Sequence, residues 1–238
     1  MVGSSVYHVD FPSDKVRYFE RFNDLLYVLI DKGQYSELYK VDPVKKKSFL
    51  LKRVNIDYND VRFADSEGVF SMVFLSEDSK ASHFTSYTIT GTKAKVGKYK
   101  IQKAEIIDWD ISFEDNSLSI FMIASDDFYS DKQYLIRVGM NYNSNKKANE
   151  IRREFDFKNY DSLKISKEKK DAFILLESDN SEKRSLDFFG VSSAFSRLGS
   201  RAIKKDRSYI KQWTKYSNNS LFIFSSVSPL GDKYYICK

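Results

Sequence analysis

The chain has few of the residues that metal sites and nucleophilic catalysis require. Its 238 residues include one cysteine, two histidines, three prolines and nine glycines. Cys237 has no partner for an internal disulfide, and His8 and His83 are too few for a zinc site with Cys/His spacing. The same shortage argues against a Ser-His-Asp triad, and the Gly-x-Ser-x-Gly motif is absent. We therefore expect no metal, no cofactor and no catalytic signature of these kinds.

Long apolar runs are missing as well. Apolar runs such as Phe121-Met122-Ile123-Ala124 and Leu25-Leu26-Tyr27-Val28-Leu29-Ile30 are far shorter than the roughly 18 residues of a transmembrane helix. The segment from Met1 to His8 lacks the basic stretch and apolar core of a signal peptide. This pattern predicts a cytoplasmic protein, although an exported domain whose leader has been removed would begin in the same way.

Neither sign of charge dominates the sequence. Lys and Arg number 39 and Asp and Glu number 33, which gives a net charge of +6, and both signs are mixed along the chain. Such mixing is typical of a solvated surface, whereas a nucleic-acid-binding protein concentrates its basic residues. One segment is locally basic, and its cations are Arg197, Arg201, Lys204, Lys205 and Arg207. We interpret it first as a solvated loop, and alternatively as an anion-binding site for nucleic acid or phospholipid.

The chain is rich in aromatic residues and in short apolar runs that repeat. Hydrophobic residues make up 42% and aromatic residues 16%, a composition that excludes disorder. Five apolar runs start at residues 25, 69, 118, 172 and 221, so their spacings are 44, 49, 54 and 49. Each run is rich in β-branched or aromatic residues and has the length of a strand. Near-continuous apolarity predicts strands that are buried on both faces.

Further strand-like stretches flank every run, with polar turn residues between them. Those before the runs cover residues 16–22, 61–64, 109–113, 163–166 and 209–216, and those after them cover 38–42, 86–89, 134–138, 186–189 and 234–237. A more charged fourth stretch follows in four repeats, at 48–54, 95–103, 150–155 and 201–205. Lys and Arg in such a position are typical of an exposed sheet edge. A short helix-like pattern overlaps the last of these stretches, over residues 193–205.

Four strands per 40–50 residues are typical of a β-propeller. Residues 37–42 resemble the end of a third blade strand, and residues 63–70 resemble the corner between a first and a second strand. The resemblance to the β-propeller superfamily extends over nearly the whole chain. Its WD40 branch has a Trp-Asp ending on its blades, whereas the single Trp-Asp pair here, Trp109-Asp110, falls in a first strand. No subfamily is therefore assigned.

The resemblance implies an all-β fold, a five-bladed β-propeller that occupies residues 1–238 as a single domain. The fifth repeat stops after its third strand, and a strand-like segment precedes the first repeat at residues 5–11. We expect this N-terminal strand to pair with the last blade and to close the ring. The alternatives are a two-sheet β-sandwich and two small β domains.

The first strands hold the candidate site. In propellers these strands line the central channel, and five-bladed glycosidases place carboxylates there as acid and as base or nucleophile. The candidate funnel residues are Asp108, Trp109, Asp110 and Trp213. Further carboxylates from other first strands are Glu20, Asp60 and Asp161. The alternative interpretation of these acids is that they are ordinary solvated or hydrogen-bonded carboxylates. The two tryptophans serve either as a platform for a sugar or as packing between blades.

The first functional prediction is a non-catalytic scaffold that binds a protein or peptide partner on the propeller rim, because no catalytic motif is recognisable. The second is a carbohydrate-binding or glycoside-hydrolase-like propeller that uses the acidic and aromatic residues of the funnel. The third is the binding of nucleic acid or anionic lipid through the basic segment.

Overall fold

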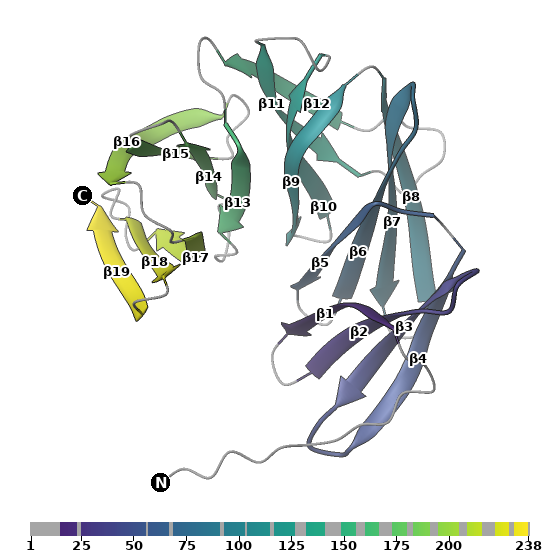
Figure 1. Ribbon diagram of the computed structural model, residues 1–238. Coiled ribbons are helices and arrows are strands. Elements are labelled where there is room, and N and C mark those ends of the chain that lie inside the picture. Colours follow the sequence, from purple (N-terminus) through teal and green to yellow (C-terminus); the bar gives the residue numbers. More distant parts are fainter. Residues whose placement is uncertain are drawn as a thin grey trace, which may run out of the picture. The chain divides into compact units, whose positions relative to one another are not determined.

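The fold is built from β-strands. The computed structural model describes residues 15–22, 25–55, 57–66, 69–90, 93–102, 104–114, 117–126, 132–140, 149–155, 160–166, 173–179, 183–190, 195–204, 209–215, 222–228 and 231–237 (Figure 1). Every regular element within these ranges is a strand, so none of them is a helix long and apolar enough to cross a membrane.

The strands form five antiparallel sheets in which neighbours along the chain are neighbours in the sheet. Four sheets have four strands and the fifth has three. The first two sheets contain β1 (Val16–Phe22), β2 (Leu25–Asp31), β3 (Ser36–Asp42) and β4 (Lys47–Val54), then β5 (Asp60–Ser66), β6 (Val69–Glu77), β7 (Ala81–Thr90) and β8 (Lys93–Gln102). The next two contain β9 (Glu105–Glu114), β10 (Ser117–Ser125), β11 (Gln133–Gly139) and β12 (Asn149–Phe155), then β13 (Ser162–Ser166), β14 (Phe173–Asp179), β15 (Lys183–Gly190) and β16 (Ser196–Lys204). The three-stranded sheet contains β17 (Tyr209–Lys215), β18 (Phe222–Ser228) and β19 (Gly231–Cys237).

The five apolar runs of the sequence are the second strands of these sheets, namely β2, β6, β10, β14 and β18. Each of them is hydrogen-bonded to a neighbouring strand on both sides and therefore lies in the interior of its sheet. Strands in this position are buried on both faces when both faces of the sheet are covered. In β2, for example, Leu29 and Ile30 point to opposite faces and both are fully buried. The prediction of an all-β fold with repeated four-stranded sheets is thus confirmed.

One local expectation is wrong. The segment with the helix-like pattern, 193–205, contains strand β16 instead, and its pairing with β15 runs from Lys183 opposite Lys204 to Gly190 opposite Ser196. A short amphipathic pattern gives a helix little stability of its own, whereas pairing with β15 satisfies the backbone of this outer strand. The expected closing strand, 5–11, lies outside the described residues.

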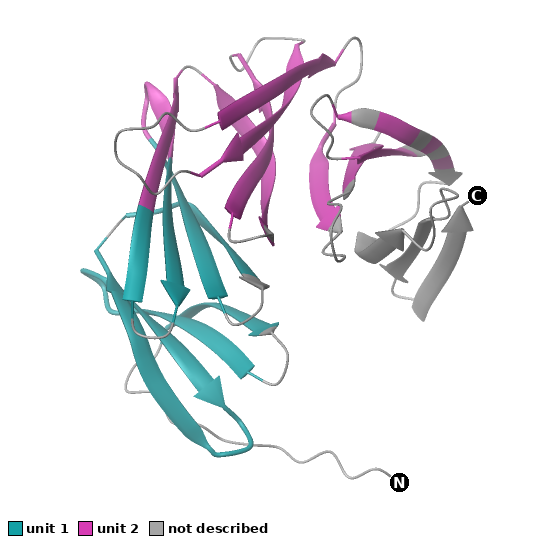
Figure 2. Ribbon diagram, turned by 180° about the vertical axis from the view of Figure 1, so that it is seen from behind, with its two compact units in different colours: residues 1–77, 84–96 teal, residues 78–83, 97–238 magenta. Residues whose placement is uncertain are grey.

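The chain divides into two compact units, which are coloured separately in Figure 2. Unit 1 comprises residues 1–77 and 84–96, and unit 2 comprises residues 78–83 and 97–238. Each unit is described by itself, and the single domain over 1–238 stays a prediction.

Unit 1 has an aromatic core between its sheets. Tyr27 of β2 stacks on Phe70 of β6 with their ring centroids 4.0 Å apart, and Phe63 of β5 meets the edge of Phe70 at 5.2 Å. Tyr18 of β1 meets Phe63 in turn, at 4.6 Å. Offset and edge-to-face aromatic pairs add to the stabilisation that comes from burying the rings. These rings therefore join the first sheet to the second.

Unit 2 has a comparable core. Phe155 at the end of β12 meets Tyr160 at a centroid distance of 4.8 Å and Phe189 of β15 at 5.8 Å. Ile123 of β10 and Ile174 of β14 belong to the same buried cluster. The sheets β9–β12 and β13–β16 are thus held together by one apolar layer.

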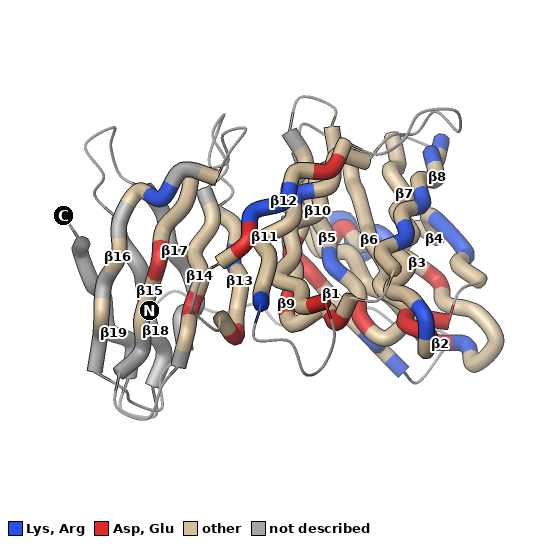
Figure 3. The backbone as a smooth tube through the Cα atoms, turned by 90° about the horizontal axis from the view of Figure 1, so that it is seen from above, with Lys and Arg blue, Asp and Glu red and all other residues tan. Residues whose placement is uncertain are grey.

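The outer strands are the charged ones. Figure 3 shows Lys and Arg in blue along β4 and β8, whose sequences are Lys-Ser-Phe-Leu-Leu-Lys-Arg-Val and Lys-Ala-Lys-Val-Gly-Lys-Tyr-Lys-Ile-Gln. Most side chains of β8 are exposed. Positive charge on an outer strand opposes pairing with another chain, as the sequence pattern predicted.

One acid is buried in the first sheet. Glu37 of β3 is 4% exposed and accepts hydrogen bonds from the Tyr39 hydroxyl at 2.8 Å and from Arg53 Nε at 2.9 Å. Arg53 lies directly opposite Glu37 on β4. Burial works to raise the pKa of Glu37, but the hydrogen bonds from Tyr39 and Arg53 and the charges of Arg53 and Lys32 outweigh it, so the pKa lies below the ordinary value of 4.5.

Glu37 should make the stability of the protein depend on pH on the acid side. A carboxyl group whose pKa is lowered by folding stabilises the protein above its unfolded pKa of 4.5, and this contribution is lost as the pH falls through the folded pKa. We expect the difference in free energy of unfolding between wild type and Glu37→Gln to be largest at neutral pH and to shrink below pH 4.5. Urea unfolding of both proteins across this range measures it. A difference that stays constant with pH would contradict the assignment.

Candidate functional site

The edge strand β9 of the third sheet presents two carboxylates. Asp108 and Asp110 lie on β9 two residues apart and so point to the same face of the strand, and both are half-buried. Asp108 Oδ1 accepts the backbone N–H of Trp109 at 2.9 Å, and Asp110 Oδ1 accepts that of Ile111 at 2.8 Å. Both amides belong to β9, the edge strand of its sheet. Each carboxylate therefore satisfies an edge amide of its own strand.

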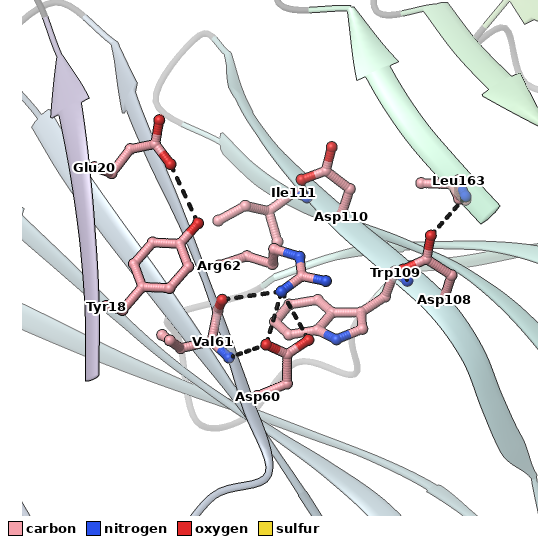
Figure 4. A network of polar contacts seen from close by, with 10 residues as sticks. All are labelled: Tyr18, Glu20, Asp60, Val61, Arg62, Asp108, Trp109, Asp110, Ile111 and Leu163. Carbon is pink, nitrogen blue, oxygen red and sulfur yellow. Dashed lines mark hydrogen bonds and ion pairs between the residues drawn. The ribbon is translucent and has the colours of Figure 1, made fainter. Parts of the chain in front are cut away.

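The second oxygens of the same carboxylates reach the next sheet. Asp108 Oδ2 accepts the N–H of Leu163 at 2.7 Å, and Asp110 Oδ2 accepts the N–H of Ile165 at 3.2 Å. Figure 4 shows the bond from Asp108 to Leu163. Strand β13, which carries Leu163 and Ile165, is the edge strand of its own sheet. We call this arrangement of Asp108, Asp110, Leu163 and Ile165 the carboxylate bridge, because it links two sheet edges within unit 2.

The tryptophans of the candidate site are placed differently. Trp109 lies between the two aspartates and points to the opposite face of β9, where it is 3% exposed. Its indole is thus buried and offers no open platform to a sugar. Trp213 lies on β17 opposite Phe224, and its side chain is outside the described part of the structure.

The other first-strand carboxylates have local partners. In unit 1, Glu20 accepts the Tyr18 hydroxyl at 3.1 Å, and Asp60 accepts the N–H of Val61 at 2.8 Å and pairs with Arg62 at 2.7 Å (Figure 4). In unit 2, Asp161 is exposed just before β13. Of the predicted carboxylates, the structure thus brings Asp108 and Asp110 together on one strand.

The basic segment is partly accounted for. Arg197 forms an ion pair with Asp187 at 2.5 Å, so its guanidinium already has an anionic partner within the protein. The backbones of Arg201 and Lys204 belong to β16, which corrects the expectation of a loop at these residues. The side chains of Arg201 and Lys204, and residues Lys205 and Arg207 as a whole, lie outside the described part, so the anion-binding hypothesis stays a prediction.

Sequence reasoning missed the partner of Arg197. Asp187 on β15 is fully buried and also accepts the Tyr160 hydroxyl at 2.6 Å. Burial and this hydrogen bond raise the pKa of Tyr160 well above its usual range, so the hydroxyl remains a donor. An aspartate inside the apolar run Leu186-Asp187-Phe188-Phe189 was the available signal, because a buried carboxylate needs a cation or donors beside it. Among the described residues, no cluster of three His, Cys, Asp or Glu could hold a metal ion.

The comparisons with known proteins concern the fold. Neither a protein-family model nor a curated protein matches the chain. Among solved structures, the exo-β-1,3-galactanase of Phanerochaete chrysosporium, crystallised with β-1,3-galactotriose, aligns with a TM-score of 0.53 and 11% identity over 97% of this chain and 62% of that one. Prolyl oligopeptidase B of Galerina marginata aligns with a TM-score of 0.47 and 13% identity, over 89% and 31% of the two chains. A bifunctional GH43-CE protein of Bacteroides eggerthii aligns with a TM-score of 0.45 and 11% identity, over 92% and 32%.

These comparisons correct the first functional prediction. The present chain spans 62% of the length of the galactanase, whose fold is a β-propeller. The prediction of a non-catalytic scaffold is wrong, because the likeness to a glycoside hydrolase propeller favours the carbohydrate alternative. Assignment to a WD40-like interaction module gains no support from these neighbours. At 11% identity the likeness shows the fold, and this chain has a fold of the β-propeller type.

Proposed function

We propose that this chain is a carbohydrate-binding, glycoside-hydrolase-like propeller whose glycan contacts Asp108 and Asp110. The carboxylate bridge is the observation that carries the proposal. Two half-buried carboxylates are held on one face of a first strand by amide N–H groups of β9 and β13. Sugar hydroxyls are hydrogen-bond donors, and ionised carboxylates are strong acceptors with several lone pairs each.

The hydrogen bonds divide the roles of the two carboxylates. The bond from Leu163 to Asp108 is 2.7 Å long, whereas the bond from Ile165 to Asp110 is 3.2 Å long. Asp110 is therefore held less tightly, and it is the better placed of the two to accept a proton from a hydroxyl or a water molecule. A hydrolysis also needs a proton donor. Of the predicted carboxylates, Asp161 belongs to the same unit as Asp110 and is the candidate for that role.

The proposal includes five blades. Five sheets support this number, and the last of them, β17–β19, has three strands where the others have four. A strand from residues 5–11 would complete it and close the ring, as the sequence repeat predicts.

The test is binding and cleavage of defined polysaccharides by the purified chain. β-1,3-Galactan, β-1,3-glucan, β-1,4-xylan and starch are each offered in affinity electrophoresis and in an assay of released reducing ends. We expect at least one of these polysaccharides to retard the protein in the gel or to be cleaved by it. Asp110→Asn should weaken that binding or cleavage about tenfold or more, since one charged acceptor is lost.

The matched control is Glu154→Gln, which removes a carboxylate of unit 2 that is exposed and paired with Lys132 at 2.8 Å. It should behave as wild type. The proposal fails if none of the four polysaccharides is bound or cleaved, or if Asp110→Asn and Glu154→Gln have the same effect.

A further inference from the structure

Unit 1 contains a pocket that none of the first-strand carboxylates lines. Its volume is about 410 Å³, within the roughly 300–1,000 Å³ of small-molecule sites. The turn between β2 and β3 forms one wall, Asn55, Asp57 and Tyr58 form another, and Arg17 of β1 completes the lining.

The wall formed by the turn is held in place by hydrogen bonds. Asp31 at the end of β2 accepts the N–H of Gly33 at 2.7 Å and Arg17 Nε at 2.9 Å, and Lys32 donates its N–H to the Tyr35 carbonyl at 2.8 Å. Gly33 has a φ of +86°, a conformation that a residue with a side chain rarely adopts. These contacts neutralise Arg17 and fix the backbone, so this part of the pocket is formed before any ligand arrives.

Three polar side chains of the lining have no hydrogen-bonding or ionic partner among the residues that the structure describes. Gln34, Asn55 and Asp57 are exposed, and within the part of the chain that is described none of them makes a hydrogen bond or an ion pair. Two carboxamides and one carboxylate together supply both donors and acceptors. These groups are available to a ligand without the loss of an existing contact.

Two tyrosines of the lining are held in place by contacts with neighbouring residues. Tyr58 packs edge-on against the buried Phe74 with a centroid distance of 4.8 Å, and its hydroxyl lies 3.4 Å from Ser36 Oγ. The Tyr35 ring lies 5.4 Å from the guanidinium carbon of Arg53. Rigid aromatic rings with a polar tip offer apolar contact at little entropic cost.

We propose that this pocket binds a neutral saccharide through Gln34, Asn55 and Asp57, with Tyr35 and Tyr58 against its apolar faces. Neutrality follows from the charges of the lining. Arg17 is already paired with Asp31, so a phosphate or sulfate would meet the negative charge of Asp57 without a free cation. A polyhydroxylated ring suits the mixed donors and acceptors.

This site is additional to the carboxylate bridge, which lies in unit 2, and it does not depend on the proposed function. The test uses the full chain, labelled with ¹⁵N and titrated with β-1,3-galactotriose, xylotriose, cellotriose and maltotriose in turn. We expect at least one trisaccharide to shift the amide signals of Gly33 to Ser36. The Asn55→Ala/Asp57→Ala double variant should weaken that binding about tenfold or more, the factor expected when two modest hydrogen bonds are lost.

Two controls separate this site from the bridge. Asp110→Asn should leave the shifts at Gly33 to Ser36 unchanged, whatever it does to binding in unit 2. Because Asn55 and Asp57 are exposed and make no hydrogen bond or ion pair within the described residues, their double variant should keep the melting temperature of wild type. The inference is overturned if no trisaccharide shifts these signals, or if the shifts persist in the double variant at the same affinity.

Discussion

Replacing Arg197 by alanine is expected to lower the free energy of unfolding by about 3 kcal/mol, because it removes the cation that is ion-paired with the buried carboxylate of Asp187. Asp187 has no exposed side-chain surface, and Arg197 Nη2 lies 2.5 Å from its Oδ1. After the substitution Asp187 would keep the hydrogen bond that it accepts from the Tyr160 hydroxyl at 2.6 Å. We place the loss at the lower end of the range that is usual for breaking a buried ion pair, because the Arg197 side chain is itself 46% exposed.

Arg152→Ala is the matched control for this prediction. Arg152 also belongs to unit 2, but its acidic neighbours Glu150 and Asp126 are exposed and lie 3.5 and 3.8 Å away. Exposed pairs of this kind contribute less than about 1 kcal/mol. Urea unfolding of the two variants gives the comparison directly. Equal losses would mean that burial of Asp187 is not what makes its ion pair important.

The second strands were the part of the fold most open to prediction. A run such as Leu25-Leu26-Tyr27-Val28-Leu29-Ile30 is buried on both faces whatever its neighbours are, so apolarity alone indicates its place in the sheet. An outer strand carries no such signal. In β16 the residues Ser196-Arg197-Leu198-Gly199 share polar and apolar character with an amphipathic helix, and pairing with β15 decides the outcome.

The sequence predicted where the two carboxylates of the candidate site lie, but not which groups they contact. A first strand with two acidic residues at alternate positions indicates two carboxylates on one face, which is what Asp108 and Asp110 form. Their partners, the amides of Leu163 and Ile165, are backbone groups more than fifty residues away, as the separation of 55 shows. No side chain marks them in the sequence. Arg197 was misjudged as a solvated cation for the same reason, because the burial of Asp187 is a property of the assembled sheets.

The carboxylate bridge should also be a large stabilising feature in its own right. Each carboxylate accepts one amide on each of two strands, and asparagine offers a single oxygen beside an NH₂ group. In Asp108→Asn and Asp110→Asn the NH₂ would therefore face an N–H donor of β9 or β13. Leaving a partly buried donor unsatisfied costs about 1–3 kcal/mol. We expect the Asp108→Asn/Asp110→Asn double variant to lose roughly 3 kcal/mol of unfolding free energy, less than the full sum because both residues face the same strand.

Asp60→Asn separates this effect from the loss of charge. Asp60 accepts the N–H of its own neighbour Val61, as the bridge residues do, but its other partner is the side chain of Arg62. One asparagine oxygen can keep the bonds that Oδ1 of Asp60 already accepts from Val61 N at 2.8 Å and Arg62 Nη1 at 2.7 Å, whereas the ion pair between Oδ2 and Arg62 Nη1, also at 2.7 Å, is lost. The expected cost is below about 1 kcal/mol. An equal loss of unfolding free energy for Asp60→Asn and for the double variant in urea would contradict this. In that case the stability comes from negative charge on a first strand, and not from the link between β9 and β13.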